Sequence, residues 1–268
     1  MKGNNTMKAL ATRDQKIKYL RAYFTTHGLF TIKSTKTVKG QKYGYRTLIL
    51  YLKSSTSGGY GNLCPMAGAC KVPCLGLTAG MLSWDIAQDA EQRRTDLFFL
   101  DRPYFLERAT REIVNHVRYC KLRGYKPVVR FNGASDFPFE TLGIIQQFPD
   151  VQFYDYTKIA KRAFRSLQDP TWPKNYKLCF SFDEKPNSIP DSQRFLSLGG
   201  NVAVVFGPDQ AGHMPKSYQL PRIFLSVDVV DGDKSDLVFL NPPGTILGLR
   251  AKGEARHDTS GFVVRYAN

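Results

Sequence analysis

The chain has 268 residues, of which 42% are hydrophobic and 13% aromatic, a composition that excludes a disordered or collagen-like polymer. Lys and Arg number 38 against 23 Asp and Glu, which leaves a formal charge of +15. The polar N-terminus and the lack of an apolar run of about 18 residues argue against a signal peptide and a membrane span. We therefore expect a cytoplasmic protein of one large domain or two small ones.

The first 53 residues carry most of the positive charge, with twelve Lys or Arg and a single acid, Asp14. Apolar periodicity predicts a helix over residues 13–26, and the pattern over 30–39 and 45–53 predicts a hairpin-like pair of strands. Clustered cations favour DNA or RNA as a partner, because they release counterions along phosphates. A solvated arm is the alternative.

Aromatic residues are interleaved with these cations. They can stack on bases, or they can form the apolar face of the predicted helix. The rings concerned are Tyr19, Tyr23, Phe24, Tyr43 and Tyr45.

From residue 75 to 207 the pattern alternates between helices and strands, which predicts a parallel sheet with right-handed crossovers. Helices are expected over residues 75–94, 103–123, 139–147, 159–167 and 192–198, with Gly124 as a C-cap. Strands are expected over 128–131, 151–156, 177–182 and 201–206.

The last part of the chain is rich in predicted strands. Residues 208–220 form a loop, and 223–230 and 237–240 flank Asp231-Gly232-Asp233 as a hairpin. Further strands are expected over 245–250 and 262–266. The predicted fold is α/β, a partial or irregular barrel. A basic N-terminal extension (1–53) precedes the core (54–207), and a β-rich C-terminal part (208–268) packs on the same domain.

Three of the five cysteines lie within eleven residues, in the loop that follows the first apolar strand. Cys64, Cys70 and Cys74 have the spacing C-x5-C-x3-C, on a stretch rich in Gly, Ala and Pro. Thiolates on one loop suit an iron–sulfur cluster or zinc. We favour a [4Fe–4S] cluster with one iron free to hold S-adenosylmethionine, although radical-SAM proteins carry C-x3-C-x2-C. Zinc and three ordinary buried thiols remain as alternatives.

Polar residues follow the predicted parallel strands, where ligands bind in such folds. We divide these residues into a group with catalytic or orienting roles and a group that contacts a cofactor. Helix capping is the structural alternative for Asp136 and Asp183. The first group is Asn132, Ser135, Asp136, Asp155, Tyr156 and Lys158. The second is Gly133, Ser181, Asp183 and Gly207, in which Gly133 permits close backbone approach to a ligand.

Other candidate ligands are weaker. Any of His27, His116, His213 and His257 could complete a Cys3His zinc site, yet isolated histidines are usually solvated. The acids around Gly232 lack the spacing of an EF-hand, and a turn explains them.

Several sequence blocks resemble one known family. CPMAGACKVPCLGLTAGM, RTDLFFLDRPYFLERATREI, VRFNGASDFPFE, VQFYDYTK, NYKLCFSF, NVAVVF, VVDGDKSDLVFL and GLRAKGEARHDTSGFV occur in consistent order from about residue 60 to 264 and are similar to the phage and plasmid "gene product 88" family. The resemblance implies a radical-SAM-like iron–sulfur protein on a partial barrel, located in the host cytoplasm when phage-encoded. It also implies that Cys120 and Cys179 are not obligatory ligands.

Two functions follow as hypotheses. In the first, the chain is an iron–sulfur enzyme in which strand-end polar groups orient S-adenosylmethionine. In the second, a cluster or zinc ion stabilises a protein that binds DNA or RNA through its basic N-terminal segment without catalysis.

Overall fold

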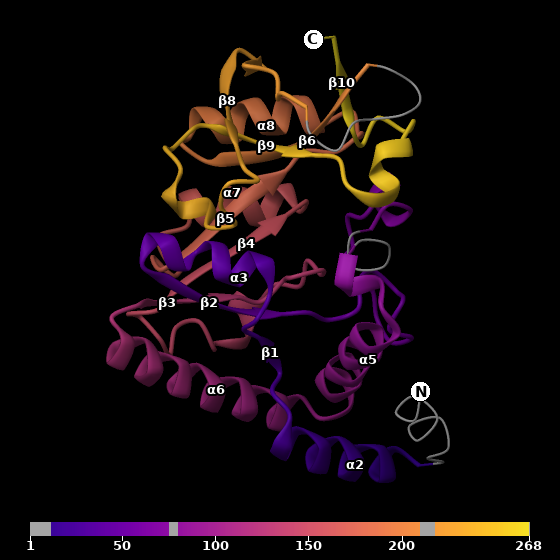
Figure 1. The fold of residues 1–268 in the computed structure, drawn as a ribbon, viewed down its shortest axis with the longest axis vertical. Coiled ribbons are helices and arrows are strands. Elements are labelled where there is room, and N and C mark those ends of the chain that lie inside the picture. The colour runs from indigo at the N-terminus through magenta and orange to yellow at the C-terminus, as the bar shows by residue number, and fades with distance from the viewer. Residues whose placement is uncertain (1–11, 75–79, 210–217, 268) are drawn as a thin grey trace.

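The computed structural model describes residues 12–74, 80–209 and 218–267. Within them, one ten-stranded sheet runs along the length of the molecule (Figure 1). Its strand order is β1-β2-β3-β4-β5-β6-β9-β8-β7, and β10 pairs with the end of β6. The end strands β1 and β7 are not neighbours, so this sheet is not a closed barrel. The predicted α/β class is confirmed.

The strands from β2 to β6 are parallel and lie side by side in chain order. They span Tyr45–Leu50 (β2), Lys126–Arg130 (β3), Gln152–Thr157 (β4), Tyr176–Ser181 (β5) and Asn201–Pro208 (β6).

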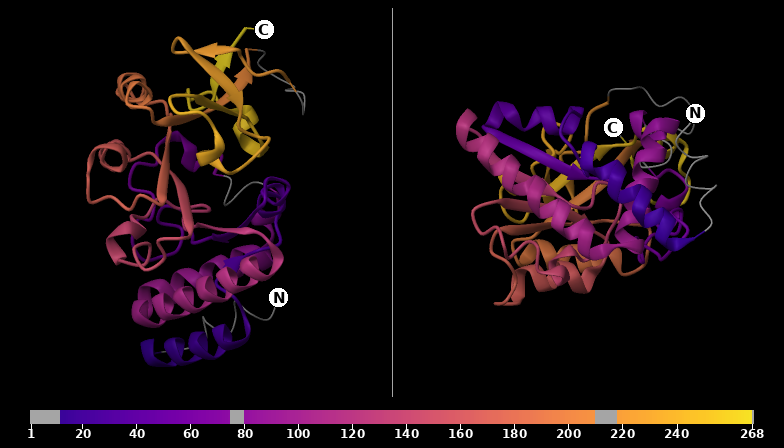
Figure 2. Two further views of the ribbon diagram at one scale, coloured as in Figure 1. Left: turned by 90° about the vertical axis from the view of Figure 1, so that its left-hand side faces the viewer. Right: turned by 90° about the horizontal axis from the view of Figure 1, so that it is seen from below.

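The connections between these strands contain α5 (Asp85–Leu100), α6 (Arg102–Arg123), η4 (Phe139–Leu142), α7 (Ala160–Gln168) and α8 (Ser188–Ser197). When successive strands are neighbours, right-handed crossovers place their connections on one face. Figure 2 shows α7 and α8 on the same side of the strands.

Side chains alternate between the two faces of the sheet, as the period of a strand requires. On the helix side, Leu48, Val129 and Phe153 pack with α6, and further along Phe180 and Val204 pack with α7 and α8. A separate cluster on the opposite, inner face includes Val128, Tyr154, Cys179, Ala203 and Leu247. It is covered by η5 (Val238–Leu240). The inner face is therefore filled by the chain's own C-terminal part.

The N-terminal segment is built into this core. Helix α2 (Arg13–Thr26) begins with a capping box between Thr12 and Gln15, and buries Leu20 and Phe24. The predicted helix is confirmed, and α2 packs on α5. Strand β2 is a neighbour of β3, so the segment before residue 53 contributes a strand to the sheet itself.

Four of the five rings considered for base stacking are packed in the protein. Tyr19 and Tyr23 pack with Phe24 on the main core, and Tyr23 also stacks on His27 with ring centres 3.9 Å apart. Tyr45 meets Phe239 on the inner face. The helix-face interpretation therefore describes Tyr19, Tyr23 and Phe24, whereas Tyr45 packs from strand β2. Only Tyr43 among the five is exposed.

The predicted first hairpin is partly wrong. Strand β1 is only Phe30–Thr31, paired antiparallel with β2, and residues beyond it form α3 (Thr35–Lys39) and η1 (Gln41–Tyr43). A capping box between Ser34 and Thr37 starts α3, and this local hydrogen bonding overrides the alternating pattern.

Three predicted helices also differ. Residues 75–79 lie outside the described residues, and the helix expected over 75–94 is observed as η3 (Gly80–Ser83) and then α5. The helix expected over 139–147 is reduced to η4, because Gly143 adopts a left-handed conformation with φ of 73°. Helix α8 starts at Ser188, four residues before the prediction.

The predicted C-terminal hairpin is wrong. Strand β8 (Val227–Asp231) pairs antiparallel with β7 (Ile223–Phe224) and parallel with β9 (Ile246–Arg250), while residues 238–240 form η5. Instead of making a tight hairpin turn, Asp231 and Asp233 accept hydrogen bonds from Arg250. The chain ends with η6 (Gly253–His257) and β10 (Val264–Tyr266).

Candidate functional site

The cysteine loop follows β2 and lies across the carboxyl ends of neighbouring strands. Cys64 lies where the loop meets the strand-end segments, Cys70 lies in η2 (Ala69–Lys71), and Cys74 follows shortly after. All three side chains are half-buried. Cys120 and Cys179 are fully buried elsewhere, on α6 and β5.

Two other strand-end segments hold this loop. After β3, the Asp136 backbone N–H donates to the Leu63 carbonyl at 2.7 Å. After β5, Glu184 Oε1 accepts from the Ala69 N–H at 2.8 Å, and Lys185 Nζ donates to the Met66 carbonyl. The loop is thus fixed to the ends of β3 and β5 as well as β2, at the edge where parallel α/β folds bind ligands.

Two of the three thiols contact neighbouring segments of this edge. Cys64 Sγ lies 3.7 Å from the Ala134 carbonyl, and Cys74 Sγ lies 3.3 Å from Ser54 Oγ. Burial raises the pKa of Cys64 to about 11, and nearby Asp136, Cys74 and Cys70 raise it further. A bound cation would favour the thiolate form of Cys64 over this buried, neutral thiol.

Three cysteine thiols therefore suit a soft metal, but their side chains are not arranged as a complete set of metal ligands. Across residues 12–74, 80–209 and 218–267, no three His, Cys, Asp or Glu side chains stand together as a metal site. Within the part of the chain that the structure describes, the buried Glu184 Oε2 accepts no hydrogen bond, although Glu184 Oε1 does.

Asn132, Ser135 and Asp155 are brought together in a buried network. Asp155 accepts from the Asn132 backbone N–H at 2.7 Å, from Asn132 Nδ2 at 3.2 Å and from the Tyr176 hydroxyl at 2.8 Å. Ser135 Oγ donates to Asn132 Oδ1 at 2.8 Å. Burial raises the pKa of Asp155 to about 6, against the opposing charges of Arg162 and Arg130. Protein donors occupy the oxygens of Asp155, so the network holds the segment after β3 in place.

Asp136 is the next member and joins the ends of β3 and β4. It accepts from Arg162 Nη1 at 2.8 Å, from the Lys158 N–H at 2.8 Å and from Thr157 Oγ1 at 3.1 Å. Burial raises its pKa, and the Arg162 charge lowers it. Arg162 also makes two 2.9 Å hydrogen bonds to Glu140. Asp136 is thus an anchor between two loops and a neighbour of Cys64.

Lys158 and Asp183 face the same edge. Lys158 Nζ lies 3.4 Å from the Phe182 carbonyl and 3.9 Å from Asp183 Oδ2, which lies 3.4 Å from Lys185 Nζ. The Asp183 N–H donates to Ser188 Oγ at the start of α8. Lys185, which donates to the Met66 carbonyl, brings positive charge to the cysteine loop, and Asp183 partly offsets both lysines.

The other predicted residues are spread out. Tyr156 lies on the inner face, with the Arg130 guanidinium 4.8 Å from its ring centre. Ser181 ends β5, and Gly207 lies inside β6, opposite Arg265 of β10. A Cβ at Gly133 would come within 2.5 Å of the Tyr51 ring, so its close approach is to the protein and not to open space for a ligand.

The sequence did not reveal the residues that hold the strand-end segments of the sheet together. Glu184 and Lys185 directly follow Asp183 and could have been found as a charged run at a strand end. Arg130 interrupts an apolar strand, and its two hydrogen bonds of 2.9 and 3.1 Å to Asp236 arise from distant segments. Tyr154 also donates to Asp236, at 2.7 Å. Nothing local in the sequence identifies Asp236 as their partner.

A buried charged group lies beside the loop, after β2. Lys53 is 7% exposed and donates through Nζ to Gln88 of α5, and burial lowers its pKa. Glu91 is 1% exposed, and neither of its carboxylate oxygens has a hydrogen-bond partner. The Lys53 N–H donates to Thr95 Oγ1 at 2.9 Å, which ties α5 to this strand end.

None of the helices that the structure describes is long and apolar enough to cross a membrane. Comparison with curated proteins and with solved structures finds no match. The family model described as "Gene product 88" matches residues 27–266, which includes the cysteine loop and the whole parallel sheet. By this match over most of its length, the chain belongs to the gene product 88 family.

Proposed function

We propose that Cys64, Cys70 and Cys74 bind a [4Fe–4S] cluster and that the chain is a radical-SAM-like protein. The observation that carries the proposal is the position of the loop. The loop that carries the three thiols follows the first parallel strand, and its backbone is hydrogen-bonded to the segments after β3 and β5. Binding of a metal would release the thiol protons, because thiolates are the ligands, and would hold the three side chains together.

Neighbouring residues support an anionic cofactor at this edge. A cluster with three thiolate ligands leaves one iron for a small ligand, and such a cluster supplies the electron for reductive cleavage of S-adenosylmethionine. Lys158 and Lys185 lie beside the loop and would offset negative charge. Asp136 and Asn132 would keep the β3 end in place, while Glu184 Oε2 remains available to accept a hydrogen bond from a bound group.

The metal content of oxygen-protected protein tests the cluster. We expect a brown protein with about four irons per chain. Cys70→Ser should lose most of this iron, because it removes one of three thiolates. Cys120→Ser is the matched control, since that thiol is buried on α6 far along the chain, and its iron content should equal wild type.

The alternatives give different results. One zinc per colourless chain, lost in Cys70→Ser, would replace the cluster by a zinc site. Protein without metal after oxygen-free reconstitution with iron and sulfide would reject both.

For enzyme activity, the reduced protein with S-adenosylmethionine should release 5′-deoxyadenosine. An intact cluster without that product would favour the non-catalytic hypothesis, in which the chain binds DNA or RNA.

A further inference from the structure

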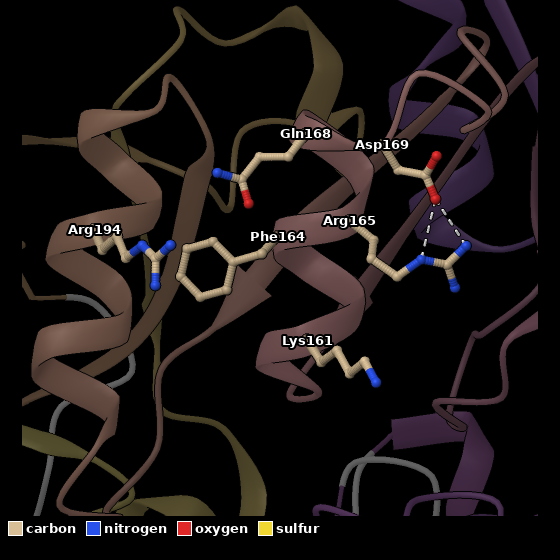
Figure 3. Close-up of a pocket in the computed structure, with 6 residues that line it drawn as sticks. All are labelled: Lys161, Phe164, Arg165, Gln168, Asp169 and Arg194. Atoms are coloured by element: carbon tan, nitrogen blue, oxygen red, sulfur yellow. Dashed lines mark hydrogen bonds and ion pairs between the residues drawn. The ribbon is translucent and has the colours of Figure 1, made fainter.

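A hollow lies between α7 and α8 on the helix-covered side of the sheet. Its volume is about 420 Å³, and four of its six lining residues come from α7, with Asp169 directly after this helix and Arg194 on α8 (Figure 3). The helices meet through Phe164 and Phe195, whose ring centres are 5.8 Å apart, and the hollow opens on the solvent side of this contact. The lining residues are Lys161, Phe164, Arg165, Gln168, Asp169 and Arg194.

The charges of the hollow are unbalanced. Arg165 is paired with Asp169, with hydrogen bonds of 3.0 and 3.2 Å. Lys161 and Arg194 are exposed, and neither has a carboxylate within ion-pair distance in the described ranges. Two uncompensated cations therefore flank a pocket with no further acid in its lining.

An aromatic ring lies between these cations. Phe164 is half-buried, and the Arg194 guanidinium lies 4.8 Å from its ring centre. Figure 3 shows the Arg194 and Phe164 side chains reaching toward each other across the gap between the helices. A planar group can bind at such a ring while its anionic part meets the cations, which is how proteins bind single-stranded nucleic acid.

We propose that this hollow binds single-stranded nucleic acid, with Lys161 and Arg194 on phosphates and Phe164 against a base. An acidic peptide without aromatic residues would match the charge but has no flat group to place against the ring. The overall charge of +15 would attract the strand at long range. The site differs from the basic N-terminal segment, in which most rings are packed in the core, and it does not depend on the cluster.

Fluorescence anisotropy with labelled oligothymidylate over a salt series tests the site. For single strands, the slope of log affinity against log salt concentration falls by about 0.7 for each phosphate contact removed. Lys161→Gln with Arg194→Gln should therefore lower the slope by about 1.4. Lys121→Gln with Arg123→Gln, exposed in the last turn of α6, removes the same charge elsewhere and should leave the slope unchanged.

A third variant tests the ring. Phe164→Leu keeps an apolar side chain against Phe195 and should weaken binding roughly tenfold at every salt concentration with an unchanged slope. Circular dichroism and thermal unfolding verify that each variant is folded.

The proposal is overturned if both double variants lose affinity equally, or if the Lys161/Arg194 pair retains the wild-type slope. It is also overturned if polyglutamate displaces the strand from wild type as well as unlabelled oligothymidylate does, because the hollow would then recognise only negative charge.

Discussion

Glu91 shows how much a single buried side chain can influence the stability of this protein. Among the described residues, its two carboxylate oxygens have no hydrogen-bond donor, and Lys53 and Arg94, whose charges act on it, form no ion pair with it. Burial raises the pKa of Glu91 to about 7, although those two cations lower it. A folded-state pKa above the unfolded value means that the protonated form favours folding. The stabilisation that protonated Glu91 gives to the folded state is complete below about pH 4 and is lost as pH rises towards 7.

Glu91→Gln removes that titration. We expect the variant to be more stable than wild type above pH 7, by up to about 3 kcal/mol, with the difference fading towards pH 4. Urea unfolding at a series of pH values measures it. Glu254→Gln, at an exposed position in η6, is the control. Parallel stability curves for wild type and Glu91→Gln between pH 4 and 8 would contradict a titrating Glu91.

At the scale of elements, the cysteine loop depends on close contact with the segment after β5. Gly68 lies where a Cβ would come within 2.0 Å of Glu184 Oε1, so an alanine there forces the loop and this carboxylate apart. The Ala69 N–H to Glu184 hydrogen bond lies next to it and would be broken. A glycine among the cysteines is readable from the sequence, whereas the reason for it is a contact 115 residues away.

Gly68→Ala should therefore reduce iron content by more than half while changing the thermal unfolding temperature little, because the loop is half-buried and outside the main core. Gly61→Ala, on the same loop, is the control: its Cβ would meet only the Phe99 ring at 3.5 Å, an ordinary contact. Equal iron in the two variants would show that docking on Glu184 does not shape the site.

On the scale of the whole molecule, residues 12–53 of the basic N-terminal segment are part of the folded core, and residues 1–11 lie outside the described residues. Phe24 is 1% exposed and belongs to the main hydrophobic cluster, and Leu20 is completely buried one turn earlier. A charge count alone allows a solvated arm. Packing of α2 on α5 instead assigns the apolar side chains to the interior and the lysines to the surface.

Phe24→Ala should lower the free energy of unfolding by about 3–5 kcal/mol, since it empties a fully packed site. Lys18→Ala, exposed on the same helix, should change it by less than about 0.5 kcal/mol. Denaturant unfolding compares the two. A neutral Phe24→Ala would mean that α2 does not contribute to the core in solution.

Elements whose signals are close together in the chain are determined by the sequence itself. Helix α6 ends at Gly124, as predicted, because a left-handed residue with φ of 71° completes its last turn. The buried run of β6 likewise predicts a strand covered on both faces. The order of strands and helices, the class of fold and the clustering of three cysteines all follow from such local patterns.

Only the tertiary structure determines which segments that are distant in the chain contact each other. Residues 237–240 pack on the inner face of the sheet. Asp231 and Asp233 accept hydrogen bonds from Arg250 instead of making a hairpin turn. Asp155 and Asp136 were identified as polar strand ends, but Tyr176 and Arg162 turn them into internal anchors. A carboxylate at a strand end has the same local sequence whether its oxygens face a ligand or a buried arginine. The register of neighbouring strands and the packing of α7 decide which of the two it meets.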